Sequence, residues 1–308
     1  MGQRAGASTA GNSCRPLAGS ISTFVSDSPP FRQEQVPTPS PQLFVVVVIL
    51  GLLGLAVTVW VFWPAFRGPE AARRDLGTHR LAIGAVIAVL ILSNLVAVLL
   101  NPFLHLEQAL SSSSFLVVAL LTDLPMLLFI YLRLILPGAL TWQDLGLRPL
   151  PLGRALRVGL GGGAIGLIAN LGVTTLLSQV GLAPNQLEQF NFALTGGVFA
   201  KVILLIFAAL IAPFVEELFF RGFIFGMYRR RKPRWVAYVA SSVLFAGPHL
   251  LSGQSNPAQL AGLAIGILVL ALVLAWLYDS TGSLYPGILA HALNNAIGLV
   301  LFYALGTS

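Results

Sequence analysis

Long apolar runs separated by short polar segments make up most of the sequence. Each run approaches the roughly twenty residues that an α-helix needs to cross the hydrocarbon core of a bilayer. Short alternating stretches of the kind that build membrane β-barrels are not part of the pattern. We therefore expect an all-α fold, a polytopic transmembrane bundle. Its predicted spans are eight, at about 43–63, 81–102, 115–136, 156–178, 197–225, 235–252, 257–278 and 284–305.

Composition supports a membrane protein. Of the 308 residues, 56% are hydrophobic and 9% are charged, whereas a soluble domain carries about 25% charged residues. Residues 1–42 are rich in Ser, Pro, Gly and Gln and are expected to be a disordered polar tail. Residues 1–25 contain Arg and Ser but no acidic residue, so an organellar transit peptide is an alternative interpretation of this segment. The single cysteine, Cys14, excludes an intrachain disulfide.

Basic residues are concentrated in alternate loops. The chain has 18 basic and 11 acidic residues, and the basic ones cluster in loops 64–80, 137–155 and 226–234. The positive-inside rule places these loops in the cytoplasm, or its organellar equivalent, with both termini on the far side. The final loop, 279–283, should share that side but contributes only Asp279. Since the positive charge is explained by orientation, we expect no nucleic-acid partner.

Besides Lys201 near its start, the fifth predicted span contains three charged residues in its second half, Glu216, Glu217 and Arg221. An ionised side chain at membrane depth costs on the order of 2.5–3.5 kcal/mol. On a helix, Glu217 and Arg221 are four positions apart and can pair directly. Glu216 lies about 100° away around the helix, so the same arginine is less well placed to neutralise it. The pattern predicts one carboxylate held for structure and one left available.

Further polar residues fall inside the sixth and eighth spans. His249 follows Pro248, which removes a helical hydrogen bond beside the imidazole. His291 and Asn295 are four positions apart and share one helical face. Burying polar groups costs the least free energy when they are hydrogen-bonded to one another, so we expect these residues to form one cluster. Asp123, in the third span, is left outside the predicted site.

The available groups limit the chemistry. The sequence has no Gly-x-Ser-x-Gly elbow, no His-Glu-x-x-His helix and no Walker A loop. A carboxylate and an imidazole can hold and deprotonate a water, while a second imidazole and an amide can donate to an oxyanion. That set suits an amide hydrolase. Glutamate and two histidines could instead ligate Zn²⁺ with one open position. A structural polar cluster without turnover is the alternative.

Three motifs in order resemble a known family. They are Glu-Glu-x-x-x-Arg at 216–221, Phe-x-x-x-His at 245–249 and His-x-x-x-Asn at 291–295. Together they resemble the CAAX-protease and bacteriocin-processing (CPBP, or Abi) family of intramembrane proteases, over about residues 195–305. The resemblance implies an intramembrane endopeptidase of the CAAX prenyl protease type. It divides the chain into the tail, N-terminal transmembrane helices at 43–150 and a catalytic membrane core at 151–308.

The resemblance also implies residue roles. Glu216 would be the general base that holds the attacking water together with His249. His291 and Asn295 would form the oxyanion hole. If the enzyme is metal-dependent, Glu216, His249 and His291 would be the ligands; a metal-free glutamate mechanism is slightly favoured. The residues expected to support the site are Glu217, Arg221 and Phe245.

Two other functional classes compete with a protease. One is a non-catalytic membrane scaffold or chaperone of the same family. The other is a transporter, although the repeated half with matching broken helices that such proteins show is not apparent. As partners we expect membrane lipid and a peptide or membrane-protein substrate. We expect the plasma membrane as the location, or an organellar membrane if the tail is a transit peptide.

Orientation can be tested directly. A cysteine placed in the loop at 229–234, with Cys14 removed, should resist an impermeant thiol reagent in intact cells, because that loop is predicted to be cytoplasmic. Labelling from outside would invert the predicted topology.

Overall fold

The computed structural model describes residues 41–104, 123–182, 197–250 and 256–306. The chain divides into two units, residues 1–44 and residues 45–308, and the helical bundle belongs to the second. The expected tail lies outside the described residues, except for its last two positions, which open the first helix. The described residues are helical or irregular, without strands, which agrees with the predicted all-α class.

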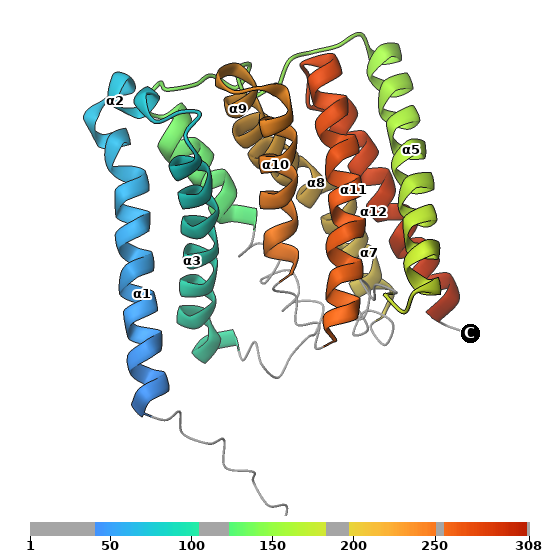
Figure 1. The fold of residues 1–308 in the computed structure, drawn as a ribbon, viewed down its shortest axis with the longest axis horizontal. Helices are drawn as coiled ribbons and strands as arrows, with labels where there is room; N and C mark the ends of the chain where they lie inside the picture. Colours follow the sequence, from blue (N-terminus) through green and yellow to red (C-terminus); the bar gives the residue numbers. More distant parts are fainter. Residues whose placement is uncertain (1–40, 105–122, 183–196, 251–255, 307–308) are drawn as a thin grey trace, which may run out of the picture. The chain divides into compact units, whose positions relative to one another are not determined.

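Long helices and one composite helix make up the described chain (Figure 1). The composite helix runs through residues 198–231 and alternates between α- and π-helical turns. The α-helices are α1 (Pro41–Phe62), α2 (Pro69–Arg74), α3 (His79–Leu104), α5 (Leu152–Gln179), α7 (Val198–Ile206), α8 (Ala212–Glu216), α9 (Gly226–Arg231), α10 (Arg234–His249), α11 (Pro257–Thr281) and α12 (Tyr285–Gly306). The other turns are the 3-10 segment η1 (Trp63–Arg67) and the π-helical segments η2 (Ile130–Ile135), η4 (Phe207–Ile211) and η5 (Glu217–Phe225).

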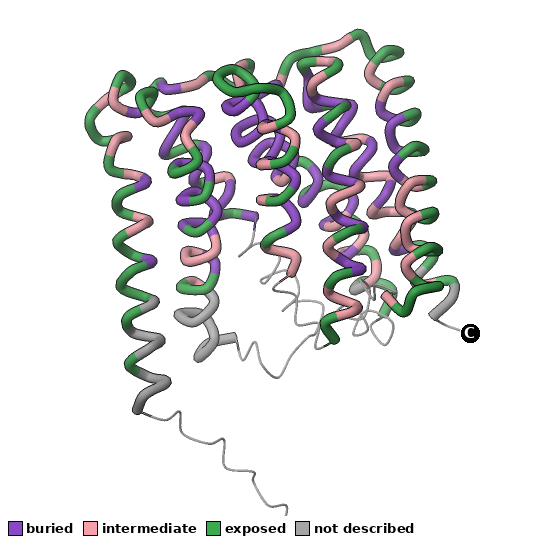
Figure 2. Tube along the Cα trace, viewed as in Figure 1, coloured by how far each residue is buried: buried purple, intermediate pink, exposed green. Residues whose placement is uncertain are grey.

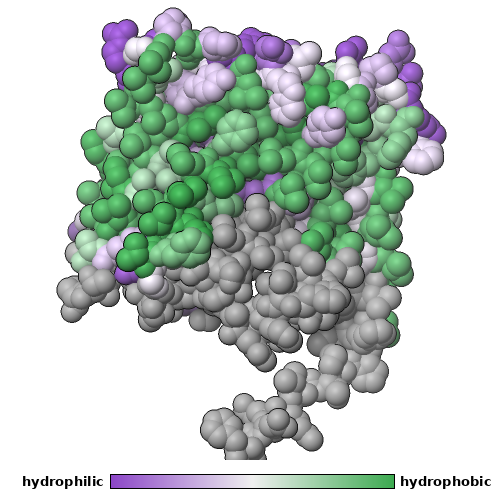
Figure 3. Space-filling view, turned by 180° about the vertical axis from the view of Figure 1, so that it is seen from behind, coloured by the Kyte–Doolittle hydropathy of each residue, from purple (hydrophilic) through white to green (hydrophobic). Residues whose placement is uncertain are grey.

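Several described helices are long and apolar enough to cross a membrane. Side chains on their outer faces are largely hydrophobic, whereas hydrophilic residues gather along one end of the molecule (Figure 3). These features indicate an integral membrane protein. The four candidate spans among the described residues are His79–Val96, Leu152–Gln179, Lys201–Arg231 and Pro257–Thr281, and Gly51–Arg67 is a shorter apolar helix.

The prediction of about eight spans is therefore confirmed in part. The four candidates correspond to the second, fourth, fifth and seventh predicted spans. Helices α1, α10 and α12 occupy the places of the first, sixth and eighth. The third predicted span, 115–136, lies partly outside the described residues and is helical from Asp123.

The composite helix forms the centre of the core. All nine residues of η5 are buried, and α10 and α11 pack against it (Figure 2). Its phenylalanines interlock, with Phe219 and Phe220 edge to face at 5.0 Å between ring centroids. A π-helix bonds each N–H five residues back and is frequent at functional sites. The carboxylates of Glu216 and Glu217 flank the start of this segment.

Glycines allow α5 to approach its neighbours closely. Gly159, Gly162 and Gly163 are buried, and α5 packs against α11 and α12. A Cβ at Gly162 would lie 2.6 Å from Leu277 on α11, and one at Gly159 would lie 2.8 Å from Leu289 on α12. The glycine cluster permits this close contact, because any larger side chain would push the helices apart.

The basic loops meet at one end of the bundle. Arg73, before α3, donates from Nη2 to the Gly138 carbonyl oxygen at 2.6 Å. The carboxylate of Asp279 pairs with Arg229 at 2.8 Å and with Arg234 at 2.6 Å. Asp279 was expected in the last loop but belongs to the end of α11. It shares the basic side, as the alternation of loops predicts, and neutralises Arg229 of α9 and Arg234 at the start of α10.

A glycine-to-alanine pair tests the packing of η5. A Cβ at Gly222 would overlap the backbone carbonyl oxygen of Leu145. We expect Gly222→Ala to lower the free energy of unfolding by about 1–3 kcal/mol, as overpacking does. Gly172→Ala is the matched control, because this glycine of α5 is exposed and a Cβ there would meet no neighbouring atom within 4 Å. Thermal unfolding in detergent would measure both, and equal melting temperatures would contradict the packing around η5.

Candidate active site

A buried ion pair lies at the start of η5. Arg221 donates from Nη1 to Glu217 Oε1 at 2.8 Å, and neither side chain is exposed at all. The second guanidinium nitrogen, Nη2, donates to the Ala271 carbonyl oxygen on α11 at 3.2 Å. The pairing predicted from the spacing of Glu217 and Arg221 is thus confirmed, and it joins η5 to α11.

His291 extends this pair to α12. Its Nδ1 lies 3.2 Å from Glu217 Oε1, the oxygen that also accepts from Arg221. Gly287, one turn earlier on α12, leaves room for the other carboxylate oxygen, since a Cβ there would lie 3.1 Å from Oε2. A carboxylate facing Nδ1 favours the tautomer with the proton on that nitrogen. Glu217 therefore orients the His291 ring and leaves Nε2 directed elsewhere.

Glu216 differs from its neighbour. It ends α8, its side chain is 16% exposed, and its Oε2 lies 3.7 Å from His291 Nε2. That separation is too long for a hydrogen bond, but it is one that a water molecule can bridge. Of the two adjacent carboxylates, Glu217 is occupied by a cation and an imidazole, whereas Glu216 keeps an accessible oxygen.

Phe245 links the two histidines and the arginine. Its ring centroid lies 5.0 Å from that of His249 and 5.9 Å from that of His291. The guanidinium of Arg221 lies over the same ring at 4.3 Å, a cation–π contact. His249 donates from Nδ1 to the Phe245 carbonyl oxygen at 2.9 Å, so a neutral His249 ring has its lone pair on Nε2. The Phe245 ring on α10 thus contacts the imidazole of His249 on its own helix and that of His291 on α12.

The two adjacent asparagines of α12 have different surroundings. Asn295 is half-buried and donates from Nδ2 to the Ala208 carbonyl oxygen in η4 at 2.7 Å. This bond uses one of the two amide hydrogens. Asn294 is buried and bonds the carbonyl oxygens of Ala290 at 2.9 Å and of Gly163 on α5 at 3.4 Å. Asn294 therefore supports the contact with α5, while Asn295 lies beside the composite helix.

The structure brings most of the predicted site together. Six predicted residues are connected through these ion pairs and ring contacts. The seventh, Asn295 on α12, is hydrogen-bonded to a backbone carbonyl of η4. Sequence reasoning left out Asp123, whose carboxyl group is buried and whose Oδ2 has no hydrogen-bond partner among the described residues. The sequence feature that could have pointed to Asp123 is the presence of an acidic residue inside an apolar run. The six connected residues are Glu216, Glu217, Arg221, Phe245, His249 and His291.

A zinc site does not fit the arrangement of these residues. Within the described part of the chain, no three His, Cys, Asp or Glu side chains are placed so that they could hold a metal ion together. The conditional ligand set of Glu216, His249 and His291 would need such convergence.

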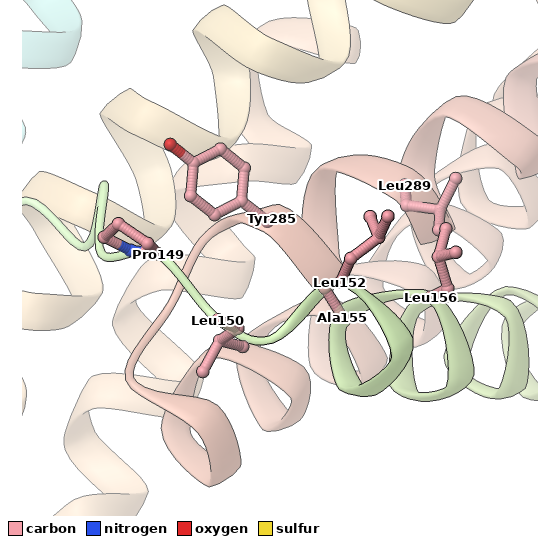
Figure 4. A pocket seen from close by; sticks show the side chains of 7 residues that line it. All are labelled: Pro149, Leu150, Leu152, Ala155, Leu156, Tyr285 and Leu289. Atoms are coloured by element: carbon pink, nitrogen blue, oxygen red, sulfur yellow. The ribbon is translucent and has the colours of Figure 1, made fainter.

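An apolar hollow of about 410 Å³ lies apart from this cluster, where the chain enters α5 beside the start of α12 (Figure 4). Its lining contains no carboxylate or imidazole, so the candidate chemistry belongs to the buried cluster. The lining residues are Pro149, Leu150, Leu152, Ala155, Leu156, Tyr285 and Leu289.

Comparisons with known proteins point to one family. A family model described as type II CAAX prenyl endopeptidase Rce1-like matches residues 197–297, the segment that holds all seven predicted site residues. The UPF0177 protein YxdF of Lactococcus lactis subsp. lactis (strain IL1403) is 30% identical over 89 residues, which are 29% of this chain and 44% of that protein. The chain thus matches less than half the length of this curated relative. No solved structure matches the chain.

The buried ion pair makes a stability prediction. Glu217→Ala leaves the Arg221 charge buried without its carboxylate, which should cost about 3–5 kcal/mol and lower the yield of folded protein. Replacing both residues, Glu217→Leu with Arg221→Met, removes the pair without an orphan charge and should recover most of that loss. Size-exclusion profiles and melting temperatures in detergent would compare them. A single variant as stable as the parent would contradict a structural role for Glu217.

Proposed function

Residues 197–297 form a domain of the Rce1-like type II CAAX prenyl endopeptidase family, and from this premise we propose that the chain is an intramembrane endopeptidase. The observation that carries the proposal is the difference between two adjacent glutamates. Glu217 is buried and paired with Arg221, whereas Glu216 is 16% exposed and faces His291 Nε2 at 3.7 Å. Glu216 is therefore the carboxylate that is available to accept a proton from a water molecule in the site.

In the proposed reaction, water is the nucleophile. Glu216 accepts a proton from it, and the resulting hydroxide attacks the carbonyl carbon of the peptide bond. The Nε2 lone pair of His249 is a second acceptor for the same water, because Nδ1 is engaged with the Phe245 carbonyl. When the tetrahedral intermediate collapses, Glu216 returns its proton to the leaving amine. The base is thus regenerated and no covalent intermediate is required.

The oxyanion would be held from α12. Asn295 retains one amide hydrogen beyond the bond to Ala208, and that hydrogen is the proposed donor. His291 donates from Nε2 when that nitrogen carries a proton, since Nδ1 is already directed to Glu217. Donors fixed in this way need no reorganisation as charge develops, and each is typically worth about 10²–10³ in turnover. Glu217, Arg221 and Phe245 position the groups without taking part in the chemistry.

The substrate is proposed only as a class of peptide. The family description points to the C-terminal peptide of a prenylated protein. A leader peptide or a segment of a membrane protein would also present a peptide bond at this depth. We assign the core at 151–308 to catalysis and the helices at 43–150 to its support. The proposed location is the plasma membrane.

Glu216→Gln tests the assignment of the base. The substitution keeps the shape of the side chain and removes its basicity, so turnover should fall by at least about 10²-fold while the melting temperature is unchanged. Purified protein would be incubated with a peptide library in detergent, and cleavage would be measured by mass spectrometry. Glu70→Gln, at an exposed position of α2, is the matched control and should cleave like the parent.

Two outcomes would contradict the proposal. Glu216→Gln with more than a few per cent of the parental turnover would remove Glu216 from the role of base. A parent protein that binds peptides but cleaves none of them would favour a non-catalytic scaffold.

A further inference from the structure

A buried glycine of α12, Gly287, faces the carboxylate of Glu217. The Oε2 atom of Glu217 is buried and has no hydrogen-bond partner among the described residues. A Cβ built on Gly287 would lie 3.1 Å from this oxygen and 3.8 Å from the carboxylate carbon. No other atom of the described chain would come within 4 Å of that Cβ, apart from its sequence neighbours and the nearby backbone of α12. The space beside Gly287 is therefore filled by one carboxylate.

Backbone conformation does not account for a glycine at this position. Gly287 is the third residue of α12, and its φ is not positive, unlike those of Gly146 and Gly282. Within a helix, alanine is more favourable than glycine, because glycine loses more conformational freedom on folding. The group that alanine would add at Gly287 is the Cβ that meets Glu217. Room for the carboxylate is thus what the glycine supplies.

Gly287 and His291 together form a seat for the Glu217 carboxylate. They are one helical turn apart and share a face of α12. Oε1 of Glu217 lies 3.2 Å from His291 Nδ1, while Oε2 lies against Gly287. The first turn of a helix also carries a partial positive charge, which favours a carboxylate that can come close to it. The seat offers a ring nitrogen at one end and space at the other.

Both oxygens of a carboxylate belong to one rigid planar group, so displacing Oε2 also displaces Oε1. Oε1 accepts from Arg221 Nη1 at 2.8 Å and lies 3.2 Å from His291 Nδ1. A Cβ at 3.1 Å would press Oε2 away by a few tenths of an ångström. The His291 ring would then lose the partner that orients it. Its Nε2, now 3.7 Å from Glu216 Oε2, would change direction as well.

We propose that Gly287 is a positioning residue for the His291 imidazole: by leaving room for Oε2 of Glu217, it fixes the carboxylate that orients the ring. This inference rests on the proposed function, in which His291 donates to the oxyanion. Gly287 takes no part in the chemistry. The direction of the imidazole is then set jointly by the start of α12 and the start of η5.

Gly287→Ala tests the seat, and Gly298→Ala is its matched control. Gly298 lies on the same helix, but a Cβ there would meet no neighbouring atom within 4 Å. We expect Gly287→Ala to lower kcat roughly tenfold with KM unchanged, because a group that acts in the transition state is misplaced by a fraction of an ångström. Gly298→Ala should keep the parental kcat. A parental kcat in Gly287→Ala would overturn the inference, whatever its melting temperature.

Shortening the carboxylate separates this contact from a general loss of stability. Glu217→Asp withdraws the carboxylate from α12 by one methylene group, so the added Cβ no longer meets an oxygen. In the Glu217→Asp protein, Gly287→Ala should therefore cause little further loss of kcat. Two losses that multiply in full would show that Gly287→Ala acts elsewhere. Should Gly287→Ala alone fail to fold, the double variant should recover folded protein, and no recovery would contradict the seat.

Nitrogen NMR of the histidine rings supplies a measurement that does not need activity. Isotope-labelled histidine would be incorporated into the full chain in detergent, and the signal missing from His291→Gln would identify His291. We expect the Nδ1 resonance of His291 to move in Gly287→Ala and to stay in place in Gly298→Ala, because its chemical shift depends on the contact with Glu217. An unmoved resonance in Gly287→Ala would contradict the proposed role.

Failure of this inference differs from failure of the proposed function. If the parent cleaves peptide, but Gly287→Ala matches it in kcat and in the His291 resonance, the seat is ruled out and the protease proposal stands. If the parent cleaves nothing while the resonance moves as expected, the seat is real and the proposed function is wrong.

Discussion

Opposite charges on Glu217 and Arg221 meet at 2.8 Å in a place where neither side chain is exposed to solvent. Either charge left alone there would destabilise the protein by several kcal/mol, so every element that touches the pair is held in place by it. Arg221 reaches α11 through the Ala271 carbonyl and α10 through the face of Phe245. Glu217 reaches α12 through His291. The position of the second imidazole, on which the proposed chemistry depends, follows from this pair.

The two adjacent glutamates lie on either side of a change in helix type. Glu216 closes an α-helical turn and Glu217 opens the π-helical segment η5. All nine residues of η5 are buried, including Glu217 and Arg221. Glu217 enters that core with its cation, whereas Glu216 stays at its margin and remains 16% exposed. A protease site in a membrane needs this combination, since it must bury a polar framework and still expose one base to water.

The spacing within one helix and the convergence of the polar residues could be predicted from the sequence, whereas the particular partner of each contact between helices could not. The pair of Glu217 and Arg221 follows from a separation of four residues, which survives the change to a π-helix. The loop alternation placed Asp279 on the basic side, although its pairing with Arg229 gave no sequence signal. The bond of Asn295 to a carbonyl in η4 joins segments that are distant along the chain. Neither hydrophobic periodicity nor motif spacing contains that information.

The division of labour between the two glutamates can be observed directly by determining the structure with a phosphonamidate peptide bound, because such an analogue of the tetrahedral intermediate presents its oxygens where water and oxyanion would lie. We expect one phosphoryl oxygen within hydrogen-bond distance of Glu216 and the other beside His291 and Asn295, with Glu217 still bound to Arg221. An analogue oxygen bound to Glu217, with the ion pair opened and Glu216 turned away, would contradict the central claim.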